Sequence, residues 1–123
     1  MKKILIIDDE KDFTQMVKLN LESTGGYKVF IENQAVNAVE TIRVIEPDLI
    51  LLDVIMPGKE GPDILFDLKA NEVYKGIPVV FLTATVTPDE VDEQEGVIGG
   101  HEFLAKPAKL QDLISCIERH LTV

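Results

Sequence analysis

The sequence has one cysteine, Cys116, no tryptophan and two histidines among its 123 residues. A single cysteine excludes an intrachain disulfide and any zinc site built from several cysteines. His101 and His120 are too few and too scattered in the sequence to indicate a zinc site. We expect Cys116 to be an inert, partly buried residue and both histidines to be exposed residues without a set role.

Long apolar runs are missing as well, since the longest, such as Ile4 to Ile7, have four residues. A segment this short cannot span a membrane. Met1 to Lys3 followed by this run imitates the start of a signal peptide, but the apolar core is too short and acidic residues end it at Asp8. We therefore expect a cytoplasmic protein that does not enter a membrane.

Basic residues are scarce, with 12 lysines and arginines against 22 acidic residues and a formal net charge of −10. A chain this acidic repels the phosphate backbone of nucleic acids, so we expect no direct nucleic-acid binding. An anionic membrane surface is disfavoured for the same reason.

Hydrophobic residues, in contrast, make up 46% of the chain. That content and the length predict a single folded domain over residues 1–123. Short β-rich runs alternate with segments of helical periodicity. The predicted strands are Ile4–Ile7, Tyr27–Ile31, Leu49–Leu52, Val79–Leu82 and Phe103–Leu104. The predicted helices are a stripe of Phe13, Met16, Val17 and Leu21, then Ala35–Ile45, Gly61–Leu68 and Leu110–Leu121, with a weak acidic helix from Pro88 to Glu95.

This alternation predicts right-handed crossovers and one parallel sheet with helices on both faces. The first, third and fourth strands are wholly apolar, which places them inside the sheet. The strand order 2-1-3-4-5 satisfies that requirement. The expected fold is therefore α/β, a flavodoxin-like doubly wound five-stranded parallel sheet.

Polar residues follow four of these strands, at the sheet edge where such folds bind ligands. Asp8 and Asp9 follow the first strand, Asp53 the third, Thr83 the fourth and Lys106 the last. Crowded carboxylates need a cation or protons, and hard oxygen ligands suit Mg²⁺. Lysine and threonine bind phosphate oxygens, and a carboxylate can accept a phosphoryl group covalently. Taken singly, each residue also has a structural interpretation, such as a surface lysine or acids that complement a helix start.

Five residues in order make the chain similar to a receiver domain of a two-component response regulator over essentially its full length. They are Asp8 and Asp9, Asp53 within Leu-Leu-Asp-Val-Ile-Met-Pro-Gly, Thr83 within Phe-Leu-Thr-Ala, and Lys106 within Phe-Leu-Ala-Lys-Pro. In addition, Gly61 closes the loop after Asp53. The resemblance implies that Asp53 accepts a phosphoryl group from a sensor histidine kinase or a phosphotransfer protein. It also implies an output through a downstream protein or effector domain.

The resemblance assigns roles to further residues. Asp8, Asp9, Asp53 and the backbone carbonyl of Ile55 would hold Mg²⁺, and Thr83 and Lys106 would bind phosphoryl oxygens. Thr83 and Phe103 would form the switch, and the bond between Lys106 and Pro107 would be cis. Ile55 and Thr85 occupy the two positions that modulate attack of water on the aspartyl phosphate.

Residues 88–100 are acidic and rich in glycine, which predicts a short or mobile fourth helix. The resemblance implies that this helix lies on a face that receiver domains use to bind partners.

Two other protein classes are alternatives to a receiver domain. An aspartate-nucleophile phosphatase would need an acid two residues after Asp53, where Ile55 stands. A receiver-like binding module that carries no phosphate is the other alternative. The sequence fits a stand-alone regulator and a receiver taken from a longer protein equally well.

Overall fold

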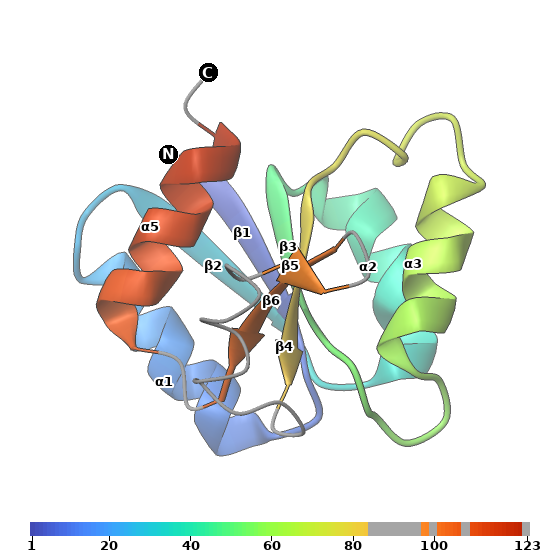
Figure 1. The fold of residues 1–123 in the computed structure, drawn as a ribbon, viewed down its shortest axis with the longest axis horizontal. Helices are drawn as coiled ribbons and strands as arrows, with labels where there is room; N and C mark the ends of the chain where they lie inside the picture. Colours follow the sequence, from blue (N-terminus) through green and yellow to red (C-terminus); the bar gives the residue numbers. More distant parts are fainter. Residues whose placement is uncertain (84–96, 99–100, 107–108, 122–123) are drawn as a thin grey trace.

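The computed structural model describes residues 1–83, 97–98, 101–106 and 109–121 (Figure 1). The elements in this part of the chain, in order, are β1 (Lys2–Ile7), α1 (Lys11–Glu22), β2 (Tyr27–Glu32), a 3₁₀ turn (Ala35–Asn37), α2 (Ala38–Ile45), β3 (Leu49–Asp53), α3 (Gly61–Lys69), β4 (Val79–Thr83), β5 (Val97–Ile98), β6 (His101–Ala105) and α5 (Leu110–Leu121).

Five of the strands form one parallel sheet in the order β2-β1-β3-β4-β6. These are the five strands predicted from the sequence, and their order along the sheet is the predicted 2-1-3-4-5. The strand β3 lies in the middle, and all of its five residues are buried. The flavodoxin-like fold expected from the apolar runs is confirmed.

A sixth strand, β5, was not predicted. Its two residues pair antiparallel with the start of β6, Val97 with Glu102 and Ile98 with His101. Val97 and Ile98 lie after the expected acidic helix, Pro88 to Glu95, within the glycine-containing segment 88–100. The expected helix itself lies outside the described residues.

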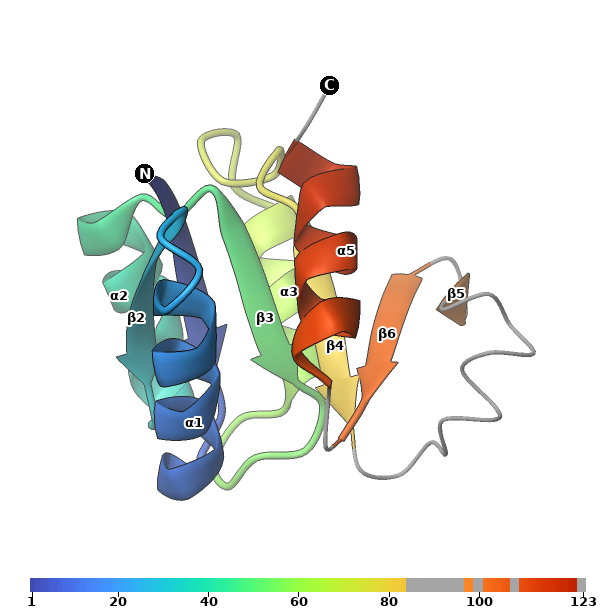
Figure 2. The ribbon, with the colours of Figure 1, turned by 90° about the vertical axis from the view of Figure 1, so that its left-hand side faces the viewer.

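The helices cover both faces of the sheet (Figures 1 and 2). Because side chains alternate along a strand, Ile4 and Ile6 of β1 point into one core and Leu5 and Ile7 into the other. Residues of α1 and α5 complete the first core, and residues of α2 and α3 complete the second. Both faces of the central strands are thus dry, which explains their uninterrupted apolar runs.

The core-facing side of α1 differs from the predicted stripe. Met16 is 40% exposed, whereas Thr14 is buried beside Val17 and Leu21. The Thr14 hydroxyl donates a hydrogen bond to the carbonyl of Lys11 and accepts one from Asn33, so burial leaves its polar atom satisfied. The other three predicted residues, Phe13, Val17 and Leu21, do face this core, so the prediction is wrong for Met16 alone.

The other helix boundaries follow the sequence signals closely. The predicted helix Ala35–Ile45 begins with a 3₁₀ turn and becomes α-helical at Ala38. It ends at Ile45, where Glu46 adopts a left-handed conformation with φ of 52° before Pro47. In the described part of the chain, no helix has both the length and the apolar character needed to cross a membrane.

Candidate functional site

The carboxyl ends of the parallel strands bring three of the predicted acids together. Asp8 follows β1, Asp9 comes next to it, and Asp53 is the last residue of β3. One carboxylate oxygen from each lies within 4.8 Å of the others. Asp8 and Asp53 are buried while Asp9 is exposed, so the cluster has a dry side and a solvent side.

The loop after Asp53 returns closely over the strand end at Gly61. The Gly61 amide donates a hydrogen bond of 2.8 Å to the carbonyl of Val54. A Cβ atom at residue 61 would lie 2.3 Å from the carbonyl oxygen of Asp53. Any side chain would displace the backbone that carries Asp53, so glycine is required here for close approach.

Lys106 reaches into this cluster from the end of β6. Its Nζ lies 2.6 Å from Oδ2 of Asp8, 3.0 Å from Oε1 of Glu10 and 3.5 Å from Oδ1 of Asp53. The same ammonium lies 4.9 Å from the centre of the Phe13 ring, a favourable cation–π distance. Its side chain is 7% exposed, so these acids, rather than water, neutralise its charge.

Burial and mutual repulsion shift the acids toward the protonated form. Burial, followed by the charge of Asp8, raises the pKa of Asp53 to about 6, against the opposing effect of Lys106. Burial also raises the pKa of Asp8, although its contacts with Lys106 and the Glu10 amide work in the other direction. Burial would lower the pKa of Lys106, but its contacts with Asp8 and Glu10 outweigh this and raise it.

The acids have the properties of a divalent-cation site. Oδ1 of Asp8 accepts a hydrogen bond of 2.9 Å from the amide of Glu10. Within the described residues, the buried Oδ2 atom has no hydrogen-bond partner, but the Lys106 ammonium contacts it at 2.6 Å. A buried carboxylate oxygen that an ammonium neutralises, next to two more carboxylates, fits a hard cation such as Mg²⁺.

Thr83 ends β4, the strand next to β3, while Phe103 lies within β6 and Ile55 lies on the loop after Asp53. Thr83 is buried at the end of β4, and its carbonyl accepts a hydrogen bond of 2.9 Å from the amide of Lys106. Phe103 is partly buried and stacks on Phe81, with 5.1 Å between ring centroids. Ile55 is 56% exposed on the loop after Asp53. Thr85 and Pro107, and so the predicted cis bond, lie outside the described residues.

Three neighbours of the site were not identified from the sequence. Glu10 and Phe13 contact the Lys106 ammonium, and the Asn33 side chain donates a hydrogen bond of 2.8 Å to the carbonyl of Asp8. The position of Glu10 directly after the two aspartates was an available signal. The contact of Phe13 with Lys106 depends on how α1 packs, and the hydrogen bond from Asn33 to Asp8 depends on the pairing of β1 with β2. Neither feature can be recognised from a local sequence pattern.

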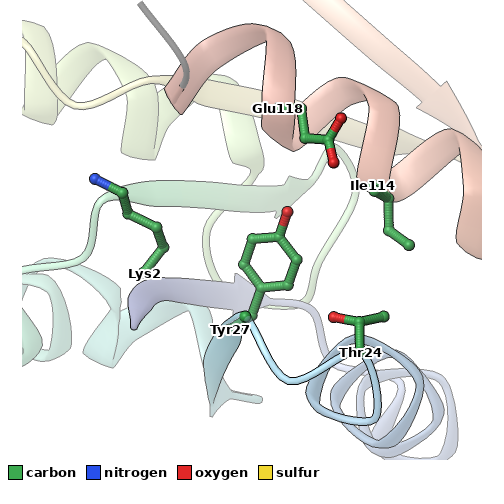
Figure 3. A pocket seen from close by; sticks show the side chains of 6 residues that line it. Lys2, Thr24, Tyr27, Ile114 and Glu118 are labelled. Atoms are coloured by element: carbon green, nitrogen blue, oxygen red, sulfur yellow. The ribbon is translucent and has the colours of Figure 1, made fainter.

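A hollow of about 440 Å³ lies at the opposite end of the sheet (Figure 3). Its lining residues are Lys2, Thr24, Gly26, Tyr27, Ile114 and Glu118. Lys2 and Tyr27 begin β1 and β2, whereas the acids follow the strand ends. This hollow is therefore separate from the acidic cluster, and it lies away from the edge where parallel sheets bind ligands.

Comparisons with known proteins agree with this geometry. The chain resembles the chemotaxis protein CheY4 of Vibrio cholerae at 29% identity and a TM-score of 0.81, covering 98% of this chain and 99% of that one. It resembles the signal receiver domain of a signal transduction histidine kinase from Syntrophus aciditrophicus at 32% identity and a TM-score of 0.81, with coverages of 99% and 91%.

A third solved relative is the signal receiver domain of the DNA binding response regulator protein merR from Colwellia psychrerythraea. It shares 28% identity at a TM-score of 0.79, with 97% of each chain covered. The family model described as the response regulator receiver domain matches residues 4–118. This chain therefore belongs to the response regulator receiver domain family of two-component signalling.

Proposed function

We propose that this chain is a single receiver domain that accepts a phosphoryl group on Asp53. The observation that supports the proposal most strongly is the position of that carboxylate. It ends the central buried strand, with carboxylate oxygens of Asp8 and Asp9 within 4.8 Å and the Lys106 ammonium at 3.5 Å. The donor is a sensor histidine kinase or a phosphotransfer protein that carries phosphohistidine.

The Asp53 carboxylate acts as the nucleophile in this proposal. With its pKa at about 6, it is mostly ionised at neutral pH. One of its oxygens forms a bond to phosphorus while the bond from phosphorus to the donor imidazole nitrogen breaks, and that nitrogen keeps the electron pair. The Lys106 ammonium and the Thr83 hydroxyl stabilise the charge on the phosphoryl oxygens.

Asp8, Asp9, Asp53 and the backbone carbonyl of Ile55 are the groups that would hold Mg²⁺. The three carboxylate oxygens that lie within 4.8 Å of one another support this assignment. When bound, the cation supplies positive charge that offsets the negative charge of the carboxylates and of the incoming phosphoryl oxygens. Lys106 supplies further positive charge to Asp8 and Asp53.

Phosphorylation alters the surface through Thr83 and Phe103. Lys106 and Thr83 follow the phosphoryl oxygens, and the movement of Thr83 opens space for an aromatic ring. Phe103 stacks on Phe81 in an adjacent strand and is partly buried, so a second position for its ring changes the exposed surface near β4 and β6. A downstream protein or effector domain reads that change.

The chain is a signalling switch rather than a turnover enzyme in this proposal. An aspartate-nucleophile phosphatase would place an acid two residues after Asp53, and that residue is the exposed, apolar Ile55. A binding module without phosphate would have no use for a buried aspartate whose pKa is shifted toward neutrality. The proposal keeps the cytoplasmic location expected from the sequence.

The test of the donor is phosphotransfer in the full chain. A phosphorylated histidine kinase or phosphotransfer protein is mixed with this chain in excess Mg²⁺, and loss of label from the donor is followed. We expect transfer to the parent and to Asp12→Asn, an exposed acid near the site, and none to Asp53→Asn. Equal labelling of Asp53→Asn would refute the assignment of the acceptor.

A further inference from the structure

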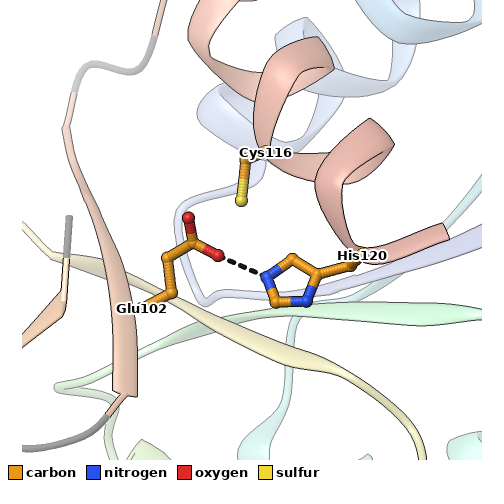
Figure 4. A group of neighbouring side chains, drawn as sticks. All are labelled: Glu102, Cys116 and His120. Carbon is orange, nitrogen blue, oxygen red and sulfur yellow. Dashed lines mark hydrogen bonds and ion pairs between the residues drawn. The ribbon is translucent and has the colours of Figure 1, made fainter. Parts of the chain in front are cut away.

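A second group of metal-ligating side chains lies between β6 and α5. It lies on the face of the sheet that α5 covers, opposite to the face that carries Phe81. Glu102 comes from β6, and Cys116 and His120 come from α5 (Figure 4). One donor atom from each, a carboxylate oxygen, a thiol sulfur and an imidazole nitrogen, lies within 4.8 Å of the other two. This cluster shares no residue with the Asp8, Asp9 and Asp53 cluster.

The spacing along α5 explains why two of these side chains converge. Cys116 and His120 are four residues apart, so they lie on the same side of the helix, one turn above the other. Glu102 faces them from the neighbouring strand, and its Oε2 atom contacts Nε2 of His120. Its other oxygen, Oε1, accepts a hydrogen bond from Arg119, which fixes the orientation of the carboxylate.

We propose that Glu102, Cys116 and His120 bind one Zn²⁺ ion, with a water as the fourth ligand. Thiolate, imidazole and carboxylate are the three side-chain types that zinc binds in proteins, in a tetrahedral arrangement. Arg119 donates a hydrogen bond to Oε1 of Glu102, the oxygen that does not contact His120. Hydrogen bonds of this kind to the side chains that bind zinc hold those side chains in position. A sulfur and a nitrogen ligand disfavour Mg²⁺, which prefers oxygen.

The protonation states of Glu102 and Cys116 decide how this cluster can bind a metal. Burial would raise the pKa of Glu102, but the contacts with Arg119 and His120 outweigh it and lower the pKa, so this ligand is already a carboxylate. Burial and the charge of Glu102 raise the pKa of Cys116 to about 12, so the thiol is protonated before metal binds. Zinc then forms a bond to sulfur, and the thiol proton leaves to solvent.

Access to the cluster is through His120 and not through Cys116. The cysteine is fully buried, whereas the His120 side chain is 30% exposed and Glu102 is 12% exposed. In the structure, His120 Nε2 contacts the Glu102 carboxylate directly. Zinc binding replaces this contact with two metal bonds, one to each side chain.

The test uses Co²⁺ as a spectroscopic substitute for zinc in the intact, chelator-treated chain, with excess Mg²⁺ to occupy the acidic cluster. Cobalt bound to a thiolate gives a near-ultraviolet charge-transfer band, and Cys116 is the one cysteine in the sequence. We expect one cobalt per chain with this band, and its loss when Zn²⁺ is added. His120→Gln should weaken cobalt binding at least tenfold.

Two variants keep the outcome interpretable. Cys116→Ser should abolish the band, and a urea unfolding curve shows whether this buried replacement still folds. The His120 side chain is partly exposed, so His120→Gln should fold as the parent does. This variant therefore tests the site even if Cys116→Ser fails to fold. The other histidine provides the matched control, His101→Gln, which should bind cobalt as the parent does. Absence of the band in the parent, or an unchanged affinity in His120→Gln, would overturn the proposal.

Discussion

The ammonium of Lys106 lies closer to Asp8, at 2.6 Å from Oδ2, than to Asp53, at 3.5 Å from Oδ1. The lysine therefore neutralises the acid beside the proposed acceptor more directly than the acceptor itself. Burial and the charge of Asp8 raise the pKa of Asp53 to about 6, and the more distant lysine does not cancel this effect. In the proposed function, Lys106 shifts from Asp8 toward the phosphoryl group once that group is present.

Replacing Lys106 with methionine should destabilise the chain in metal-free buffer at neutral pH. The change leaves Asp8 and Asp53 buried without their cation, and breaking a buried ion pair costs about 3 kcal/mol. The free energy of unfolding in urea measures the effect. Lys109→Met is the matched control, because Lys109 is exposed, and it should change stability by less than about 0.5 kcal/mol. Equal losses in the two variants would show that the Lys106 contacts contribute nothing.

The contribution of Asp53 to the stability of the metal-free chain should fall as pH rises from about 4 to about 6. The pKa of Asp53 is 3.8 in its ordinary state and about 6 when folded, so the folded chain binds this proton more tightly than the unfolded chain does. The resulting stability is fully present below about pH 4 and is lost as pH passes about 6. Its size is up to about 3 kcal/mol.

The matching measurement compares the parent with Asp53→Asn at several pH values in chelator. The asparagine variant lacks the titrating carboxyl, so it should be more stable than the parent at pH 8 by up to about 3 kcal/mol, and the advantage should vanish near pH 4. An advantage that is independent of pH would mean that burial of the charge is not its source.

Mg²⁺ should bind to the acidic cluster and stabilise the fold by linkage. Asp9 is the exposed member of that cluster, so Asp9→Asn can be made without opening the core. The midpoint of thermal unfolding should rise with added Mg²⁺ in the parent and in Asp12→Asn, and much less in Asp9→Asn. If Asp9→Asn responds to Mg²⁺ as the parent does, the cation is held elsewhere.

Exchanging Ile55 for asparagine should shorten the life of the phosphorylated state. Hydrolysis needs a water in line with the phosphorus–oxygen bond, and the exposed Ile55 side chain has no atom that can hold one. An amide at this position can orient water, which should speed phosphate loss about 10- to 100-fold, or about 1.4 to 2.7 kcal/mol of barrier. Decay of the purified phosphoprotein in Mg²⁺ gives the rate. Ile55→Val, which stays apolar, should decay like the parent, and the prediction fails if the asparagine variant does the same.

The parts of the fold that could be predicted are those marked by a distinct local pattern in the sequence. Four-residue apolar runs such as Leu49–Leu52 are buried on both faces, and parallel sheets need such strands in the middle. The residue after each strand is then placed by the topology, so Asp8 and Asp53 could be brought together without any knowledge of packing. Their positions were therefore predictable to the residue.

The parts that were missed depend on how elements pack. Thr14 replaces Met16 in the core because its hydroxyl finds partners at Lys11 and Asn33, which polarity alone does not show. The strand of Val97 and Ile98 depends on pairing with β6. The approach of Glu102 to Cys116 and His120 depends on how α5 packs on the sheet. The spacing of the two helix residues is visible in the sequence, but their proximity to Glu102 is not.

The mass of the intact chain after exposure to acetyl phosphate and Mg²⁺ tests the central claim most directly. We expect the parent to gain the mass of one phosphoryl group, to gain none when a chelator removes the Mg²⁺, and the added mass to map to the peptide that contains Asp53. Asp53→Asn should keep its original mass under the same conditions. An unchanged mass in the parent, or the same gain in Asp53→Asn, would contradict the account.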